Sequence, residues 1–222
     1  NKKVLVIGTG ISGMGAAKLL CSEGAIPIFY DENEKIKPEE VQGKMPEGVS
    51  GEVIIGSLPE SIKEEVVLAV PSPGVPVDTD FMEDLEKRGI PVWGELELGY
   101  RYAKGRLAAI TGTNGKTTTT TLVGQMMKGY YPSVFVVGNI GTPYTQSALE
   151  MEGGSVTVAE VSSFQLETTK TFRPHVSAIL NITPDHLNRH HTMENYVAAK
   201  ERIAKNQTKE DVCVLNYEDG YT

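Results

Sequence analysis

The middle of the chain carries glycine, hydroxyl and lysine residues in an order and spacing that bind a nucleoside triphosphate. Residues 111–117 read Thr-Gly-Thr-Asn-Gly-Lys-Thr and follow a short apolar run at residues 107–110. A glycine-rich loop between a buried strand and a helix presents backbone N–H groups and the positive end of the helix dipole to a phosphate. We expect Lys116 to pair with the outer phosphates and the Thr117 hydroxyl to hold Mg²⁺. The residues expected to contact the nucleotide are Gly112, Thr113, Asn114, Gly115, Lys116, Thr117 and Thr118.

This loop departs from the usual G-x-x-x-x-G-K-[ST] pattern, because Ile110 stands where glycine is expected. A plain glycine turn with a surface lysine is the alternative interpretation. The arrangement of strand, loop and helix favours the nucleotide site over that alternative.

A second glycine-rich loop lies near the start of the chain. Residues 8–13 read Gly-Thr-Gly-Ile-Ser-Gly after an apolar run at residues 3–7, and a second apolar run at residues 26–30 ends in Asp31. A G-x-G-x-x-G loop followed by an acidic residue at the end of the next strand is typical of dinucleotide-binding sites. Taken alone, the pattern indicates NAD, although such a loop can hold any diphosphate and a purely structural turn is also possible.

Two further strands are expected to bring polar side chains to their carboxyl ends. The strand at residues 156–160 ends in Glu160, and the strand at residues 176–182 is followed by Asp185 and His186. A carboxylate at a strand end beside a phosphate loop is a typical Mg²⁺ ligand, with an exposed glutamate of no role as the alternative. His186 is equally compatible with a ligand and with a structural residue, whereas His190 and His191 are expected at the surface.

The alternation of strand and helix patterns predicts an α/β protein. We expect a Rossmann-like parallel-sheet domain at residues 1–93, followed at residues 94–222 by an incomplete α/β domain of the P-loop ATPase type. The charged run within residues 32–40 is expected to be a solvated loop. Further strands are expected at residues 53–55, 66–70, 90–93, 134–137 and 211–215, and helices at residues 59–65, 79–88, 95–102 and 195–205.

Composition and charge narrow the classes of function. The 222 residues carry a formal net charge of −8 without a basic stripe, which argues against a polymeric nucleic acid as partner. Cys21 and Cys213 lie far apart in apolar segments, so we expect buried thiols in a reducing compartment. Glycines interrupt the apolar run at the start, which argues against a signal peptide, and no stretch is long enough to span a bilayer. We expect a cytoplasmic protein without membrane insertion, and a monomer.

Several of these motifs together resemble the Mur ligase family. They are residues 111–117, Gly138-Asn139, Ala159-Glu160 with Ser-Ser-Phe-Gln-Leu-Glu at residues 162–167, and Asn-Ile-Thr-Pro-Asp-His at residues 181–186. The run at residues 162–167 and Ser-Pro-Gly at residues 72–74 are similar to the members that add D-glutamate. The resemblance covers nearly the whole chain, and the combined motifs are highly specific.

The resemblance implies an ATP-dependent amide ligase of bacterial peptidoglycan synthesis. Its substrates would be UDP-N-acetylmuramoyl-L-alanine, D-glutamate and ATP, with an acyl phosphate as intermediate and with Mg²⁺, including a second Mg²⁺, as cofactor. The first glycine loop would then hold a UDP-sugar and not NAD. An NAD(P)-binding dehydrogenase or sensor module with an incidental P-loop is the alternative from another class. A folylpolyglutamate synthetase of similar architecture is expected to lack the leading G-x-G-x-x-G domain.

The resemblance also implies roles for individual residues. Lys116, His186 and Lys200 would be catalytic, and Lys200 matches a lysine that family members carry carbamylated. Thr117, Glu160, His186 and carbamylated Lys200 would bind metal. The residues that would contact the UDP-sugar substrate are Thr9, Gly10, Ile11, Ser12, Asp31, Ser72, Pro73, Gly74, Asn139, Ser162 and Gln165.

Three departures from the family pattern affect these expectations. Asn188 stands where an aspartate is usual, which would loosen its pairing with Arg189 but leave the chemistry intact. Glu32-Asn33 follows Asp31 where some relatives have Thr-Arg, so the contacts to uracil are open at that point. Family members also continue through more of the ATPase domain and into a third domain. We therefore expect this sequence to be a fragment without the C-terminal part, and to be inactive by itself.

Overall fold

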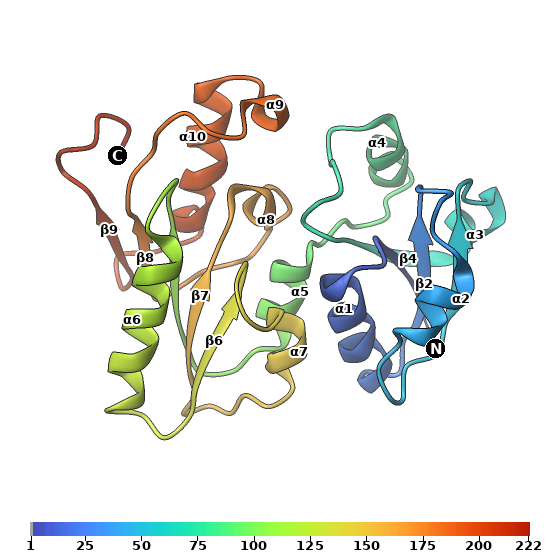
Figure 1. The fold of residues 1–222 in the computed structure, drawn as a ribbon, viewed down its shortest axis with the longest axis horizontal. Helices are drawn as coiled ribbons and strands as arrows, with labels where there is room; N and C mark the ends of the chain where they lie inside the picture. Colours follow the sequence, from blue (N-terminus) through green and yellow to red (C-terminus); the bar gives the residue numbers. More distant parts are fainter. Residues whose placement is uncertain (1) are drawn as a thin grey trace.

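Two parallel β-sheets lie side by side in the computed structural model, which describes residues 2–222 (Figure 1). Every hydrogen-bonded pair of neighbouring strands within each sheet is parallel. Helices connect the strands, as parallel pairing requires. The α/β fold class predicted from the sequence is therefore confirmed.

The first sheet is built from residues 3–71 and has four strands in the order β3-β2-β1-β4. Its central strand is the apolar run after Lys3, in which Val4, Leu5, Val6 and Ile7 are all buried. A strand covered on both faces reads as a continuous apolar run, which explains why it could be predicted. The strands are β1 (Lys3–Ile7), β2 (Ile26–Asp31), β3 (Glu52–Ile55) and β4 (Val66–Pro71), and the helices are α1 (Ile11–Ser22), α2 (Pro38–Gly43), α3 (Glu60–Glu65) and α4 (Asp80–Lys87).

The second sheet has five strands in the order β6-β7-β5-β8-β9. In its register Ile110 on the central strand lies beside Glu160 on one neighbour and Ala178 on the other, so the carboxyl ends of three strands meet at one edge. The strands are β5 (Arg106–Thr111), β6 (Val134–Gly138), β7 (Val156–Glu160), β8 (Val176–Ile179) and β9 (Val212–Leu215). The helices are α6 (Lys116–Lys128), α7 (Tyr144–Ala148), α8 (Ser163–Glu167), α9 (Leu187–His190) and α10 (Met193–Glu201), followed by the 3-10 turn η1 (Arg202–Ala204).

Three helices lie between the two sheets: α1, α7 and the connecting helix α5 (Glu95–Tyr102) (Figure 1). Their backbones approach closely, because a Cβ atom on Gly15 would lie 2.9 Å from Thr145 Oγ1 and one on Gly99 would lie 2.9 Å from Thr145 N. Ala148 of α7 belongs to the same apolar cluster as the core of the first sheet. The predicted boundary between residues 93 and 94 stays a prediction, and Gly94 is the N-cap of α5.

Two buried glutamates fix α5. Glu95 Oε1 accepts hydrogen bonds from Thr145 N and Thr145 Oγ1, both at 2.7 Å. Glu97 accepts from the backbone N–H groups of Lys170 at 2.9 Å and Phe172 at 3.0 Å, and from Arg101 Nε at 2.8 Å. Burial raises the pKa of Glu95, whereas at Glu97 the hydrogen bonds outweigh burial and lower the pKa. Both acids therefore act as structural acceptors that orient the connecting helix.

Three expected elements differ in the structure. The segment at residues 90–93 forms only an isolated bridge between Val92 and Ala69, because Pro91 has no N–H with which to extend a ladder. The expected strand at residues 176–182 ends at Ile179, and the chain then turns toward the phosphate loop, where Thr113 N bonds to Asn181 O at 2.8 Å. The charged run at residues 32–40 is a loop only in part: α2 starts at Pro38 and buries Val41.

The two cysteines also differ from expectation. Cys213 is exposed on β9 and Cys21 is half-buried on α1, and neither is in a disulfide. The prediction of buried thiols is therefore wrong for Cys213, because β9 is an edge strand whose residues are all exposed. None of the helices formed by residues 2–222 combines the length and the apolar character needed to cross a bilayer.

Candidate active site

The phosphate-type loop joins the end of β5 to the start of α6. Gly112 has φ +151° and Gly115 has φ +82°, conformations that residues with a side chain rarely adopt. Asn181 holds the loop in place, since its side chain accepts from Asn114 N at 2.9 Å and donates to Asn114 O at 3.0 Å. Gly115 is the N-cap of α6, which has no side-chain cap, so N–H groups of its first turn are free to bind an anion.

Two lysines converge on this loop. Lys116 Nζ donates to the carbonyl oxygens of Gly112 at 3.0 Å and Thr113 at 2.9 Å. Lys200, on α10, is almost fully buried and its Nζ donates to the same Gly112 oxygen at 2.8 Å. Burial, with a contribution from the charge of Lys116, lowers the pKa of Lys200 to about 7. The loop thus gathers positive charge, and the Lys200 amine has a substantial uncharged population near neutral pH.

Glu160 places a buried carboxylate at the end of β7. Its Oε1 accepts from Asn139 Nδ2 at 2.9 Å, whereas its Oε2 is buried without a hydrogen-bond partner among the described residues. Gly138 allows the ends of β6 and β7 to approach closely, because a Cβ atom there would lie 2.2 Å from the Glu160 carbonyl oxygen. An unpartnered buried carboxylate oxygen is unfavourable by itself and matches the hard ligand atoms that Mg²⁺ prefers.

His186 is the N-cap of α9 and its side chain is about half exposed. Its ring lies 4.9 Å from the Phe164 ring, and its Nε2 lies 3.4 Å from Asp185 Oδ2. Within residues 2–222, no three His, Cys, Asp or Glu side chains are grouped so that they could share a metal ion. Of the four predicted metal ligands, therefore, only Glu160 presents a buried and unpartnered oxygen.

Ser162 and Gln165, predicted to position the substrate, bond to each other in this structure. They form a capping box at the start of α8, in which Ser162 Oγ accepts from Gln165 N at 3.2 Å and Gln165 Oε1 accepts from Ser162 N at 3.0 Å. The capping role is a local structural reason for these residue types. Their predicted contact with substrate stays a prediction.

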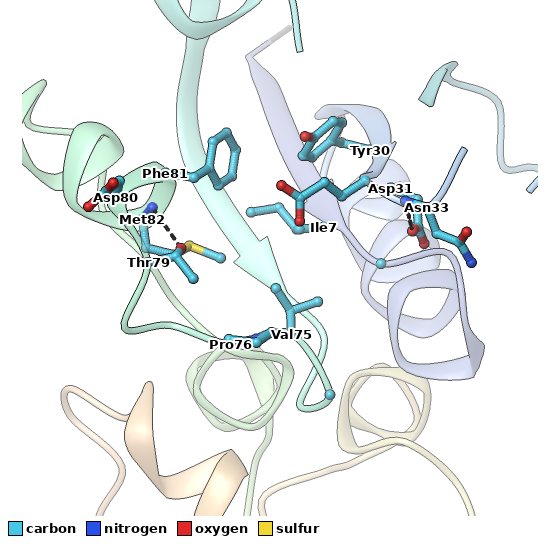
Figure 2. Close-up of a pocket in the computed structure, with 13 residues that line it drawn as sticks. Ile7, Tyr30, Asp31, Asn33, Val75, Pro76, Thr79, Asp80, Phe81 and Met82 are labelled. Atoms are coloured by element: carbon cyan, nitrogen blue, oxygen red, sulfur yellow. Dashed lines mark hydrogen bonds between the residues drawn. The ribbon is translucent and has the colours of Figure 1, made fainter. Parts of the chain in front are cut away.

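The first sheet carries a cavity of about 880 Å³ at the carboxyl ends of β1 and β2 (Figure 2). Figure 2 shows Tyr30, Asp31 and Phe81 around this space, and the Tyr30 and Phe81 ring centroids lie 5.4 Å apart. Asp31 Oδ2 accepts from Thr9 N at 3.2 Å and from Thr9 Oγ1 at 3.1 Å, which orients the carboxylate. Aromatic walls with one fixed acceptor, at the sheet edge where open α/β folds bind ligands, suit a nucleobase or ribose.

The predicted UDP-sugar residues do not line one single cavity. Asp31 and Gly74 line the large cavity. Thr9, Gly10 and Ile11 line a second cavity of about 370 Å³, beside Lys18 and Lys44. Ser72 and Pro73 line a narrow space that also reaches Gln165 of α8.

Some residues at the site were not identified from the sequence. Tyr196 of α10 is buried, and its hydroxyl lies 3.1 Å from Thr113 Oγ1 in the phosphate loop. His190 is buried as well, with Nε2 2.9 Å from Ser163 Oγ, so its expected surface location is wrong. His191 is exposed as expected. From the sequence, the position of Tyr196 in a helical segment indicates only a core residue. Its hydroxyl contact with Thr113 could not be predicted, because Thr113 lies 83 residues away in the chain.

The chain combines a Rossmann-like parallel sheet with a second parallel sheet that carries a phosphate-type loop. This combination is typical of nucleotide-binding α/β proteins. Residues 110–222 match the Mur ligase middle domain, and residues 2–94 match the N-terminal domain described as Mur ligase MurD-like. The chain belongs to the Mur ligase family, as the resemblance of its motifs predicted.

Two curated relatives share more than half of their aligned residues with this chain. The UDP-N-acetylmuramoylalanine–D-glutamate ligase of Lachnoclostridium phytofermentans is 62% identical over 221 residues, covering 100% of this chain and 49% of that protein. The ligase of the same name from Lachnospira eligens is 58% identical over 221 residues, with the same coverage of 100% and 49%. The chain spans about half the length of the curated relatives it matches.

Solved structures support the fold. A UDP-N-acetylmuramate–alanine ligase from Thermotoga maritima has a TM-score of 0.56 at 23% identity, covering 100% of this chain and 50% of that one. A UDP-N-acetylmuramate:L-alanyl-gamma-D-glutamyl-meso-diaminopimelate ligase from Neisseria meningitides has a TM-score of 0.61 at 15% identity, covering 99% and 72%. At these identities the likeness concerns the fold alone.

Proposed function

We propose that this chain provides the UDP-sugar and ATP sites of an ATP-dependent ligase that joins D-glutamate to UDP-N-acetylmuramoyl-L-alanine. The observation that carries the proposal is one sheet edge on which the phosphate loop, the unpartnered Glu160 oxygen and the buried Lys200 amine lie together. The names of the curated relatives supply the substrates. The alternative of an NAD(P)-binding module gains no support from them.

The two sheets would divide the work. Residues 1–93 would form the domain that holds the UDP portion, with Asp31 as acceptor for the base or ribose, and residues 94–222 would form the ATP-binding part. The free first-turn N–H groups of α6 and the amine of Lys116 would bind the phosphates. In this state Lys116 bonds to its own loop carbonyls, and phosphate oxygens would replace those acceptors.

Magnesium fits the chemistry of the donor atoms at this edge. Glu160 offers a buried oxygen without a partner. Thr117 is exposed on the first turn of α6 and would offer its hydroxyl oxygen. His186 would serve a second ion. Mg²⁺, when bound, neutralises phosphate charge and needs several phosphate or water oxygens besides its protein ligands. Lys200 is a candidate for carbamylation, because its pKa of about 7 leaves an uncharged amine able to react with CO₂.

The proposed reaction has two steps. The L-alanyl carboxylate of the UDP-sugar attacks the γ-phosphorus of ATP, so that an acyl phosphate forms and ADP leaves. The amine of D-glutamate then attacks the acyl carbon, forming the amide while phosphate and the amine proton are lost. Lys116 would stabilise the charge on the transferred phosphoryl group, and Asn139, Ser162 and Gln165 would align the carboxylate.

Separate binding measurements test the proposal on this chain. UDP and the non-hydrolysable ATP analogue AMP-PNP with Mg²⁺ should both bind, and NAD should not. Asp31→Ala should weaken UDP binding about tenfold, and Lys116→Ala should weaken AMP-PNP binding by a similar factor, since each removes a charged hydrogen-bond partner. NAD binding without UDP binding would contradict the proposal. In the full-length protein, release of inorganic phosphate should require D-glutamate and UDP-N-acetylmuramoyl-L-alanine together, because phosphate leaves only in the second step.

A further inference from the structure

One arginine from the second half of the chain bonds to the wall of the first sheet's cavity. Arg189 lies on α9, and its Nη2 donates to the carbonyl oxygen of Val75 at 3.1 Å and to Glu167 Oε2 at 2.5 Å. Its guanidinium also lies over the Phe164 ring, 4.8 Å from the centroid. The side chains of Arg189 and Glu167 are only 12% and 16% exposed, so the contact is shielded from solvent.

Val75 stands between that arginine and the cavity. It lines the 880 Å³ space together with Asp31 and Phe81, and Figure 2 shows its side chain on the cavity side. Val75 N bonds to Ser72 O at 2.9 Å, which closes a turn against the first glycine loop, where a Cβ atom on Gly8 would lie 2.8 Å from Ser72 Oγ. A ligand in the cavity that contacts Val75 would therefore restrict the Ser72–Val75 turn, and the Val75 carbonyl of this turn accepts the hydrogen bond from Arg189.

Arg189 itself belongs to the short helix α9, whose two flanking residues have strained backbone conformations. His186 has φ +52° and His191 has φ +66°, and they are the only residues other than glycine with positive φ in residues 2–222. They flank the four residues of α9 on either side. Such backbone strain persists only where surrounding contacts hold it. Two of those contacts come from the first domain: Val75 O to Arg189, and Asp78 Oδ2, which lies 3.4 Å from His191 Nε2.

We propose that Arg189 is a positioning residue that couples occupation of the first-domain cavity to the nucleotide site. A filled cavity fixes the Ser72–Val75 turn, the Val75 carbonyl holds Arg189, and Arg189 holds α9 with His186 at its start. The Phe164 ring, between Arg189 and His186, transmits the same constraint. The inference rests on the proposed function, because it assigns the first-domain cavity to UDP and the phosphate loop to ATP.

Linked binding measurements test this coupling. The dissociation constant of AMP-PNP with Mg²⁺ is measured by calorimetry with and without saturating UDP, in the unchanged protein and in Arg189→Met. We expect UDP to strengthen AMP-PNP binding about fivefold or more in the unchanged protein, and to leave it unchanged in the variant. Each ligand alone should still bind the variant, which separates coupling from loss of a site.

Two further variants complete the experiment. Arg173→Met is the matched control, because Arg173 bonds to Asp211 and Thr208 within the second half of the chain, and it should keep the full coupling. Asp78→Ala removes the second contact to α9 at an exposed position and should reduce the coupling partly even if Arg189→Met fails to fold. Coupling that is absent in the unchanged protein, or retained in both Arg189→Met and Asp78→Ala, overturns the inference. Absence of UDP or AMP-PNP binding in the unchanged protein overturns the proposed function itself.

Discussion

At the scale of single residues, the site depends on charged groups held away from water. Lys200 and Glu160 are both about 1% exposed and lie on different elements of the second half. Glu160 keeps one oxygen unpartnered, and Lys200 gives its hydrogen bond to a loop carbonyl. Buried charged groups are unfavourable for folding, and a buried amine with a lowered pKa, such as that of Lys200, is typical of functional sites.

The buried amine of Lys200 makes stability depend on pH in a defined direction. Its pKa is lowered from 10.5 to about 7, so between these values the unfolded chain binds more protons than the folded one. The free energy of unfolding should therefore rise with pH from 7 toward 10, by at most about 1.4 kcal/mol per pH unit. Lys200→Met should lack this slope. Urea denaturation of both proteins in buffers without CO₂, compared at each pH, measures it, and parallel curves would contradict the assignment.

At the scale of elements, the glycine loops set how closely strands and helices approach. In the first loop a Cβ atom on Gly13 would lie 2.1 Å from the Gly8 carbonyl oxygen, so α1 can start where it does only with glycine there. Gly10 in the same loop has no atom within 4 Å of such a Cβ position, and its φ is −82°. The two glycines therefore share a motif but not a structural requirement.

Substitution of these glycines should separate the two cases. Gly13→Ala should lower the free energy of unfolding by about 3 kcal/mol or more, because the backbone of the loop must shift to admit the methyl group. Gly10→Ala should change it by about 0.5 kcal/mol or less, since the methyl group meets open space. Thermal denaturation of both variants gives the comparison. Similar losses in the two proteins would show that the loop is not as tightly packed as described.

At the scale of the whole molecule, the two sheets meet through α1, α5 and α7 around the buried carboxyl of Glu95. Thr145 donates two hydrogen bonds to one Glu95 oxygen, and the carboxyl lies at the first turn of α5. Burial raises the pKa of Glu95 above its ordinary 4.5 despite these bonds. Folding therefore takes up a proton over the range above pH 4.5.

Replacement of Glu95 by glutamine should reveal this proton uptake. A raised carboxyl pKa makes the folded state bind more protons than the unfolded state, so its stabilising contribution is present at low pH and is lost as pH rises through the folded pKa. Glu95→Gln keeps an oxygen acceptor and does not ionise. The stability of the variant relative to the unchanged protein should therefore increase as pH is raised from 4.5. Melting temperatures across this range measure the difference, and a constant difference would contradict the prediction.

Much of the fold and of the candidate site could be predicted because the signals are local. Continuous apolar runs specify buried parallel strands, as at β1, and glycines with positive φ mark the loops at their ends. The start of the helix expected at residues 79–88 is such a local signal, because the Thr79 side chain caps α4 by accepting from Met82 N at 3.3 Å. The order of residues 111–117 alone placed Lys116 at the start of a helix. Family membership followed from such motifs without any long-range contact.

Tertiary structure alone decided which distant groups meet. Lys200 reaches the Gly112 carbonyl across 88 residues, and Arg189 reaches Val75 across 114 residues, and nothing in the local pattern of either segment indicates those partners. The burial of His190 was decided in the same way, because α8 packs against the His190 ring. The exposure of Cys213 was decided by the edge position of β9 in the sheet. A sequence encodes local conformation residue by residue, whereas burial and pKa depend on neighbours that only the folded chain brings together.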